Sequence, residues 1–198
     1  MVNEEAISEL VKLARYRLQH SLGQNVRDLR AEKDRIERLY PELREKRGVF
    51  VTLTKQGELR GCIGYPYPIM PLSDALVKAA ESAAFSDPRF EKITMEELND
   101  IKIEVSVLTL PIEIPSGESS VKQIKIGKDG LIIEMSGYSG LLLPQVATDY
   151  HFDALDFLQE TCVKAGLPRT AWMNKNCKIY KFQAEIFKEI SKGKVIRK

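Results

Sequence analysis

Helical periodicity marks several segments of the chain. Apolar side chains recur every three or four positions in residues 3–20 and, as a thinner stripe among many charges, in residues 26–39. Residues 72–85 carry alanines along one face, which permits close packing on a sheet, and residues 153–165 repeat the pattern behind an aspartate that can cap a helix. We therefore predict four helices, and a short helical turn at residues 95–99 behind a Thr-x-x-Glu capping box.

Strands are predicted where β-branched and apolar residues alternate with polar ones. Residues 48–54 and 59–64 flank a turn that contains Gly57, which predicts a β-hairpin. Residues 101–109 alternate regularly, as a strand with one buried face does. The three prolines in residues 65–71 exclude regular structure there, because each removes a backbone donor.

The second half of the chain adds further predicted strands. Residues 121–126 and 131–135 flank a Gly-Lys-Asp-Gly turn and indicate a second hairpin. Residues 141–146 are apolar but broken by a proline, which suits a buried loop or an edge strand. Residues 177–186 are predicted as a strand.

The order of these elements favours an α+β fold, with an antiparallel or mixed sheet and helices packed on it, because strands and helices do not alternate steadily. The 198 residues fit a single domain or two small lobes, and length does not decide between them. The sequence also leaves open whether the protein forms a homodimer.

Composition is that of an ordinary globular protein. With 43% hydrophobic and 29% charged residues in 22.5 kDa, the chain can bury a core without a metal or a disulfide. We expect a cytoplasmic protein without a membrane partner, because no apolar run near a terminus approaches the ~20 residues that span a bilayer and no secretion signal opens the chain. Three cysteines without a Cys-x-x-Cys pair, and two histidines, do not indicate a metal site.

Charge is nearly balanced overall but unevenly spread. Residues 81–118 hold nine acidic and three basic side chains, whereas residues 174–198 hold eight basic and two acidic ones. The basic end is either a nucleic-acid contact, with RNA as the candidate, or solvated charge that pairs with the acidic segment.

Familiar catalytic and cofactor-binding motifs are absent from the sequence, so no cofactor is predicted. The remaining candidate is Leu-Arg-Gly-Cys-Ile-Gly at residues 59–64. Gly61 and Gly64 interrupt a strand, where glycine marks a bulge or a close approach to the backbone. In an extended strand Arg60 would emerge on the same face as Cys62, where a cation favours the thiolate and can hold an anionic group.

Cys62 has two interpretations. It is either a nucleophile or ligand-contacting thiol, or a small side chain packed in the core. A catalytic cysteine needs a base, and His151 is the histidine placed to serve, although a helix-entry or surface role also suits it. Cys162 and Cys177 are predicted to lie in the core.

A second candidate segment follows the alanine-rich helix. Asp87, Pro88, Arg89 and Phe90 form a tight loop that either contacts an anionic substrate or is fixed by an internal ion pair. Trp172 either covers a sheet or anchors a partner.

Seven short motifs lie between Val49 and Phe187. They are LRGCIG, AAFSDPRF, EVSVLT, GKDGLIIE, YSGLLLPQV, FLQETCVKAGLP and KIYKFQAEIF. Through them the chain resembles the AMMECR-one family, named for the Alport syndrome, midface hypoplasia and elliptocytosis chromosomal region, in its archaeal form. The resemblance implies an α+β protein with a larger and a smaller lobe around a cleft. The motif residues that it carries over are Leu59, Arg60, Gly61, Cys62, Ile63 and Gly64, then Asp87, Arg89 and Phe90, and last Leu143, Pro144 and Gln145.

The resemblance does not supply an established reaction, and it suggests Memo-type proteins and radical S-adenosylmethionine enzymes as partners. In a first hypothesis, Cys62 is a catalytic thiol, Arg60 and Arg89 hold a small anionic substrate, and the other motif residues complete the binding site. In a second hypothesis, the signature hairpin and the proline-rich loop dock a protein partner, or the basic end contacts RNA, without catalysis.

Overall fold

The chain folds into two compact units. The computed structural model describes residues 2–24 and 28–197, and its contacts separate unit 1 (Met1–Leu108 and Glu185–Lys198) from unit 2 (Thr109–Ala184). Each unit holds one β-sheet with helices packed on it, which confirms the predicted α+β class. Within the described residues, no helix has the length and apolar character needed to cross a membrane.

Unit 1 contains a five-stranded sheet in the order β2-β1-β3-β8-β9. Its strands are β1 (Val49–Lys55), β2 (Glu58–Tyr65), β3 (Ile101–Leu108), β8 (Ala184–Ser191) and β9 (Lys194–Arg197). Its helices are α1 (Glu4–Ser21), α2 (Leu29–Leu39), α3 (Leu72–Phe85) and α4 (Met95–Leu98), with a 3-10 turn at Pro41–Arg44. β1 pairs antiparallel with β2 and with β3, so the predicted hairpin is confirmed.

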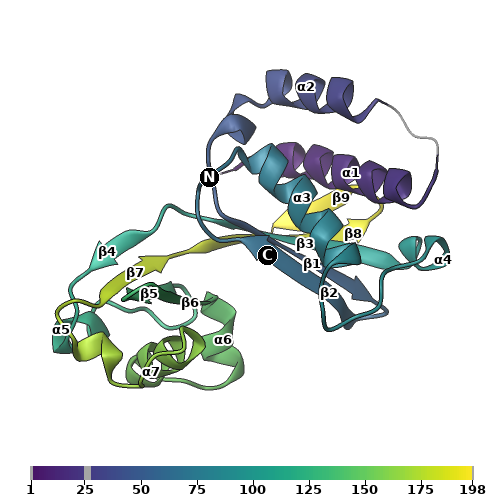
Figure 1. Cartoon of the computed structure of the whole chain (residues 1–198). Helices are drawn as coiled ribbons and strands as arrows, with labels where there is room; N and C mark the ends of the chain where they lie inside the picture. Colours follow the sequence, from purple (N-terminus) through teal and green to yellow (C-terminus); the bar gives the residue numbers. More distant parts are fainter. Residues whose placement is uncertain (1, 25–27, 198) are drawn as a thin grey trace. The chain divides into compact units, whose positions relative to one another are not determined.

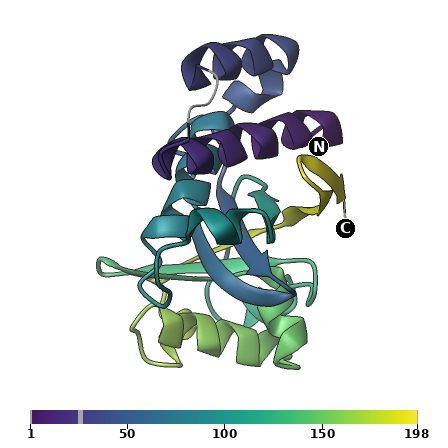
Figure 2. The ribbon, with the colours of Figure 1, turned by 90° about the vertical axis from the view of Figure 1, so that its right-hand side faces the viewer.

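Helices α1 and α3 cover one face of this sheet, and α2 stacks on α1 on the side away from the strands (Figures 1 and 2). The sheet contributes Val49, Val51 and Leu53, all fully buried, to the core beneath α3. The alanines of α3 allow the close contact with β2 that their small size predicts.

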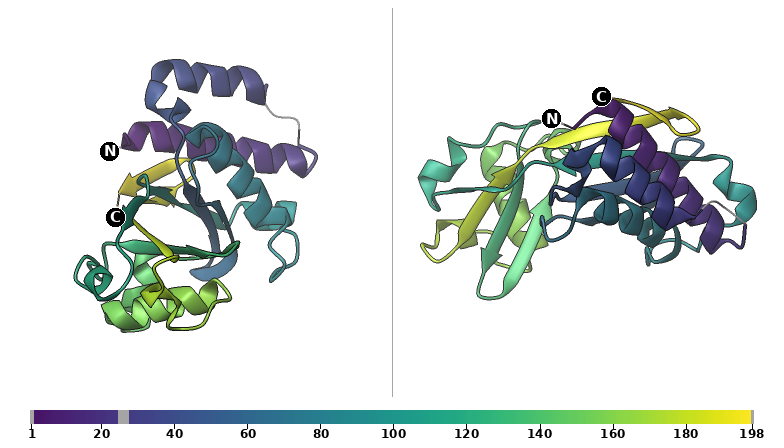
Figure 3. Two further views of the ribbon diagram at one scale, coloured as in Figure 1. Left: turned by 60° about the vertical axis from the view of Figure 1, so that its left-hand side comes forward. Right: turned by 90° about the horizontal axis from the view of Figure 1, so that it is seen from above.

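The C-terminal hairpin β8–β9 runs beside the N-terminal helix (Figure 3). The Val195 amide donates a hydrogen bond to Ser8 of α1 at 3.3 Å, which ties the two ends of the chain together. Asn3 caps α1 by accepting from the Glu5 amide, and the predicted capping box of α4 is confirmed, formed by Thr94 and Glu97. The predicted start of the second helix at Val26 lies outside the described residues, and α2 begins at Leu29 behind Asp28.

Unit 2 contains a four-stranded sheet in the order β4-β7-β5-β6. Its strands are β4 (Ile112–Ile114), β5 (Gly130–Met135), β6 (Tyr138–Leu142) and β7 (Lys178–Phe182). Its helices are α5 (Glu118–Val121), α6 (Pro144–Asp149) and α7 (Ala154–Lys164), with a 3-10 turn at Ala171–Met173. The core of unit 2 lies between α7 and the strands, around Phe157, Leu131 and Ile179.

Two predictions in this half are wrong. The expected hairpin of residues 121–126 and 131–135 does not form; β5 pairs instead with β6 through Ser136 and Gly137, whose φ angles of 53° and 84° suit a two-residue turn. The expected strand 177–186 is two strands, because β7 joins the sheet of unit 2 and β8 the sheet of unit 1. The predicted apolar segment 141–146 is divided between the edge strand β6 and the start of α6, which has Pro144 at its first position.

Candidate functional site

Cys62 lies on the face of the unit 1 sheet that the helices do not cover. It pairs with Thr52, whereas its neighbours Gly61 and Ile63 pair with the buried residues Leu53 and Val51. Side chains alternate across a strand, so Cys62 points to the opposite face from these two. The residue Cys62 as a whole is partly exposed, and the Thr52 hydroxyl donates a hydrogen bond to its sulfur at 3.3 Å.

A β-bulge decides which face Cys62 takes. The pairing shifts between Leu53, which faces Gly61, and Thr54, which faces Leu59, so Arg60 is an extra residue in β2. If Arg60 instead paired regularly with Leu53, the register counted from the turn would pair Cys62 with Val51 and place its side chain beneath the helices. The bulge therefore places the Cys62 side chain on the face that the helices do not cover.

The loop after α3 covers the free edge of β2 beside Cys62. Asp87, which is 4% exposed, accepts a hydrogen bond from the Cys62 amide at 2.8 Å. Arg89 Nη2 donates to the Cys62 carbonyl oxygen at 3.3 Å. The carboxylate and the guanidinium thus satisfy backbone groups that a neighbouring strand would otherwise bind.

Asp87 and Arg89 also bind each other. Nε and Nη2 of Arg89 donate to the two carboxylate oxygens at 2.9 and 2.7 Å, and the Arg89 amide donates to Oδ1 at 3.1 Å. The Arg89 guanidinium holds the pKa of Asp87 well below its usual value of 3.8, against burial, which acts in the opposite direction. The Asp87 carboxylate raises the pKa of Arg89, and the adjacent Cys62 contributes in the same direction.

Arg89 is the member of this cluster that faces solvent. Its side chain is 55% exposed, and among the described residues its Nη1 has no hydrogen-bond partner. The guanidinium lies over the ring of Phe90, with Cζ 5.4 Å from the ring centroid. The arrangement combines a partly exposed thiol with an oriented, exposed cation.

Arg60 belongs to a different cluster, and the alternation argument that placed it beside Cys62 is wrong because of the bulge. Its Nε and Nη2 donate to the Glu97 carboxylate at 3.1 and 3.0 Å, and Nη1 donates to the Glu91 carbonyl oxygen at 2.6 Å. Lys55 binds the same carboxylate at 3.0 Å. These cations, Arg60 first, lower the pKa of Glu97 to about 2 although burial opposes them.

The two signature glycines are required by packing within unit 1. A Cβ on Gly61 would lie 2.1 Å from the Ala83 carbonyl oxygen of α3, and a Cβ on Gly64 would lie 2.3 Å from the Phe50 ring. Neither clash can be relieved without moving backbone or a packed ring. The close approach that the glycines predicted is therefore made by the protein's own groups.

Comparison with known proteins places this architecture in a family. The AMMECR1 family model matches residues 11–187. The chain belongs to the AMMECR1 family. Protein PF1979 of Pyrococcus furiosus is 51% identical over 197 residues, covering 96% of this chain and 91% of that protein. A protein of Methanothermobacter thermautotrophicus is 50% identical over 182 residues, covering 91% of this chain and 92% of the relative.

A solved structure has the same fold. The crystal structure of the uncharacterized protein PH0010 from Pyrococcus horikoshii superposes with a TM-score of 0.83 at 44% sequence identity, covering 100% of this chain and 98% of that one. The resemblance inferred from the sequence motifs is thus confirmed for the AMMECR1 family and its archaeal members.

The remaining candidate residues of this AMMECR1 chain lie in unit 2. Gln145 is the second residue of α6, and its Oε1 is buried without a hydrogen-bond partner among the described residues. His151 is an exposed residue in the turn after α6, with a φ of 55°. Trp172 is buried, so of the two interpretations above the one in which it covers a sheet fits better. The predicted core positions of Cys162 and Cys177 are confirmed.

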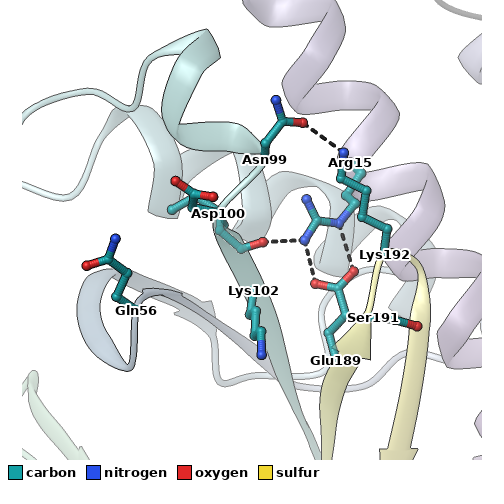
Figure 4. A pocket seen from close by; sticks show the side chains of 9 residues that line it. Arg15, Gln56, Asn99, Asp100, Lys102, Glu189, Ser191 and Lys192 are labelled. Carbon is teal, nitrogen blue, oxygen red and sulfur yellow. Dashed lines mark hydrogen bonds and ion pairs between the residues drawn. The ribbon is translucent and has the colours of Figure 1, made fainter.

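Unit 1 also contains a pocket with a volume of about 400 Å³ (Figure 4). Cys62 does not line this pocket. At its base, Arg15 of α1 donates to the Glu189 carboxylate at 2.8 and 2.5 Å and to the carbonyl oxygens of Leu98 and Ile101. Glu189 also accepts from the amides of Ile103 and Gly193. Both charged groups are therefore satisfied within the protein, and the pair joins α1 to the ends of α4, β3 and β8.

Thr52, Glu97 and the Arg15–Glu189 pair were not identified from the sequence. Thr52 occupies an ordinary polar position of an alternating strand, and its contact with the sulfur depends on the bulge. Glu97 carried a signal as the capping-box residue, which does not reveal its second role with Arg60. Arg15 and Glu189 are 174 residues apart, and nothing local in the sequence links them.

Proposed function

We propose that the chain carries a thiol-dependent site for a small anionic substrate, with Cys62 as the reacting or contacting thiol and Arg89 as the anion-binding cation. The observation that supports it best is the clamp around Cys62, which holds an exposed guanidinium beside a partly exposed thiol. Arg89 takes the role first assigned to Arg60, whose guanidinium is bound by Glu97.

The chemistry of the neighbours suits such a site. The Thr52 hydroxyl donates a hydrogen bond to the sulfur, which fixes the orientation of the Cys62 side chain. Asp87 is buried and ionised and orients Arg89 through both carboxylate oxygens, and among the described residues Nη1 has no hydrogen-bond partner. Phe90 supports the guanidinium from one side. Asp87 and Phe90 are thus positioning residues for Arg89.

Two alkylating probes test the proposal. Iodoacetate and iodoacetamide both form an S–C bond with a thiolate and release iodide, but only iodoacetate is anionic. We expect Arg89→Gln to lower the ratio of the iodoacetate rate to the iodoacetamide rate at Cys62 about fivefold, because one exposed charge contributes about 1 kcal/mol. Lys92→Gln, which removes a nearby exposed cation, is the matched control and should leave the ratio unchanged. An unchanged ratio in Arg89→Gln would refute the role of Arg89.

A protein-docking function is the second candidate, and one observation favours it. In the proline-rich loop, Ile69 is 65% exposed. Two hydrogen bonds hold the loop: the Ile69 amide donates to the Tyr67 carbonyl oxygen, and the Leu72 amide donates to the Glu45 carbonyl oxygen. A rigid loop with an exposed apolar side chain binds a partner at low entropic cost. Memo-type proteins and radical S-adenosylmethionine enzymes are the first partners to test, in the cytoplasm that we propose as the location.

Pull-down of these partners with two variants distinguishes the candidates. Ile69→Asp should abolish capture if the loop docks a partner, whereas Cys62→Ser should retain it. Loss of capture in Cys62→Ser with an intact fold would assign the partner to the thiol site instead.

Binding of RNA to the basic C-terminal segment would have to weaken as salt increases, since phosphate contacts release counterions.

A further inference from the structure

A groove of about 320 Å³ lies among the three long helices of unit 1. Leu13 of α1, Leu29 of α2 and Val77 of α3 give it an apolar lining. These helices cover the face of the sheet opposite to the Cys62 side chain, so the groove is separate from the site proposed above.

Two ionic contacts define the groove. Lys33 of α2 binds Asp74 of α3 at 2.8 Å, and Arg17 of α1 binds Glu81 of α3 at 2.9 Å. Each acidic residue that lines the groove therefore already has a cationic partner.

The remaining charges at the groove are positive. Its lining includes four cations, Arg17, Arg30, Lys33 and Lys78, and two acids, so its net charge is 4 − 2 = +2. The side chains of Arg30 and Lys78 are exposed and have no ion-pair partner among the described residues. An apolar surface beside two unpaired cations is complementary to an anionic group attached to an apolar body.

Helix α2 is held in a way that suits a ligand between it and α3. Of its residues, all of which the structure describes, Ile36 alone is buried. Leu29 packs partly buried against the core, and polar contacts hold the helix as well, including Arg35 to Glu9 at 2.6 Å and Ser73 to Glu37 at 2.5 Å. Little apolar surface of α2 is therefore buried against α3.

We propose that this groove binds an amphipathic anion, an aliphatic chain that ends in a carboxylate. The chain lies on Leu13, Leu29 and Val77, and the carboxylate pairs with Arg30 and Lys78. The ligand is a small linear molecule, because the groove lies at the small end of the volume range for ligand sites.

Decanoate is the probe, titrated into the full chain by calorimetry and by NMR of the methyl groups. We expect a Kd of about 1 mM, from the typical free energy per ligand atom. Decanoate should bind about tenfold more tightly than octanoate, because each additional methylene is removed from water. The shifts should centre on the methyl groups of Leu29 and Val77, and decyltrimethylammonium, which has the opposite charge, should bind much more weakly.

Charge variants locate the carboxylate. Arg30→Gln and Lys78→Gln should each weaken decanoate binding about threefold, and the double variant about tenfold. Arg38→Gln removes an exposed cation from the same helix outside the groove and should have no effect. These substitutions replace exposed residues, so the fold is retained, which circular dichroism checks. Cys62→Ser should also leave the affinity unchanged, which separates this site from the thiol site.

Three results would overturn the proposal. The first is an absence of saturable binding up to about 10 mM decanoate. The second is equal affinity for decanoate and decyltrimethylammonium, which would mean that the cations play no part. The third is an unchanged affinity in the Arg30→Gln, Lys78→Gln double variant, or methyl shifts that lie elsewhere.

Discussion

Replacing Asp87 by asparagine tests whether one buried carboxylate holds the Cys62 strand and the Arg89 loop together. Each carboxylate oxygen accepts two hydrogen bonds: Oδ1 from the amide and Nε of Arg89, and Oδ2 from the Cys62 amide and Arg89 Nη2. In either orientation, the amide nitrogen of asparagine would face two donors. The variant therefore loses two hydrogen bonds, one to the guanidinium and one to a backbone amide.

The structure sets the size of the effect. A hydrogen bond to a charged group contributes about 1.5–3 kcal/mol, and a neutral one about 1 kcal/mol. Arg89 is more than half exposed and regains water when its partner is lost, so its contribution falls at the low end of that range. We expect Asp87→Asn to lower the free energy of unfolding by about 2.5 kcal/mol.

The effect should depend on pH in one direction. The folded pKa of Asp87 lies below its usual value of 3.8, so the carboxylate stabilises the folded state fully above about pH 4. This contribution is lost as the pH falls through the folded pKa. The difference between wild type and Asp87→Asn should therefore be constant from about pH 5 to pH 7 and shrink below about pH 4.

Urea unfolding followed by circular dichroism measures this difference. The chain's single tryptophan, Trp172, lies in unit 2, so its fluorescence shows in parallel whether unit 2 unfolds together with unit 1. Asp34→Asn, at an exposed position of α2, is the control and should change stability by less than about 0.5 kcal/mol. A loss below about 1 kcal/mol for Asp87→Asn, or a difference that does not vary with pH, would refute the reasoning.

Three further substitutions test other parts of unit 1 by urea unfolding. Arg15→Met should destabilise by about 3–5 kcal/mol, because it leaves Glu189 buried without its charged partner; a loss under about 1 kcal/mol would contradict the pairing. Gly61→Ala should cost about 3 kcal/mol, since its methyl group would overlap the Ala83 carbonyl, and near-neutral behaviour would show that α3 can move away. Glu97→Gln should lower the free energy of unfolding by about 1 kcal/mol above about pH 5 and by progressively less toward pH 2. A destabilisation that grows as the pH falls would contradict the ion pairs of Glu97.

Much of unit 1 could be predicted from sequence because its signals are local. The periodicity of α1 and α3, the capping box of α4 and the β1–β2 hairpin each depend on residues close together in the chain. The β8 and β9 strands could not be predicted in the same way. Residues 177–186 read as one strand, and the division at Gln183, whose amide donates to Thr109, is set by the two sheets.

The site shows the same limit. The glycine at position 61 indicated a bulge or a close approach, and both occur, but the sequence could not place the extra residue at Arg60. A shift of one residue moves a side chain to the other face of a sheet. The cation beside Cys62 is therefore Arg89, from a loop 27 positions away, and strand alternation alone could not identify it.

The most direct test of the proposed site is the relative reactivity of the three cysteines in the folded protein. Iodoacetamide treatment at neutral pH, followed by peptide mapping, measures each thiol separately. Cys162 and Cys177 are buried, and burial raises the pKa of both, that of Cys177 to about 11. We predict that Cys62 reacts at least about a hundredfold faster than either. If Cys62 reacts as slowly as the two buried thiols, the site is closed and the proposed chemistry is wrong.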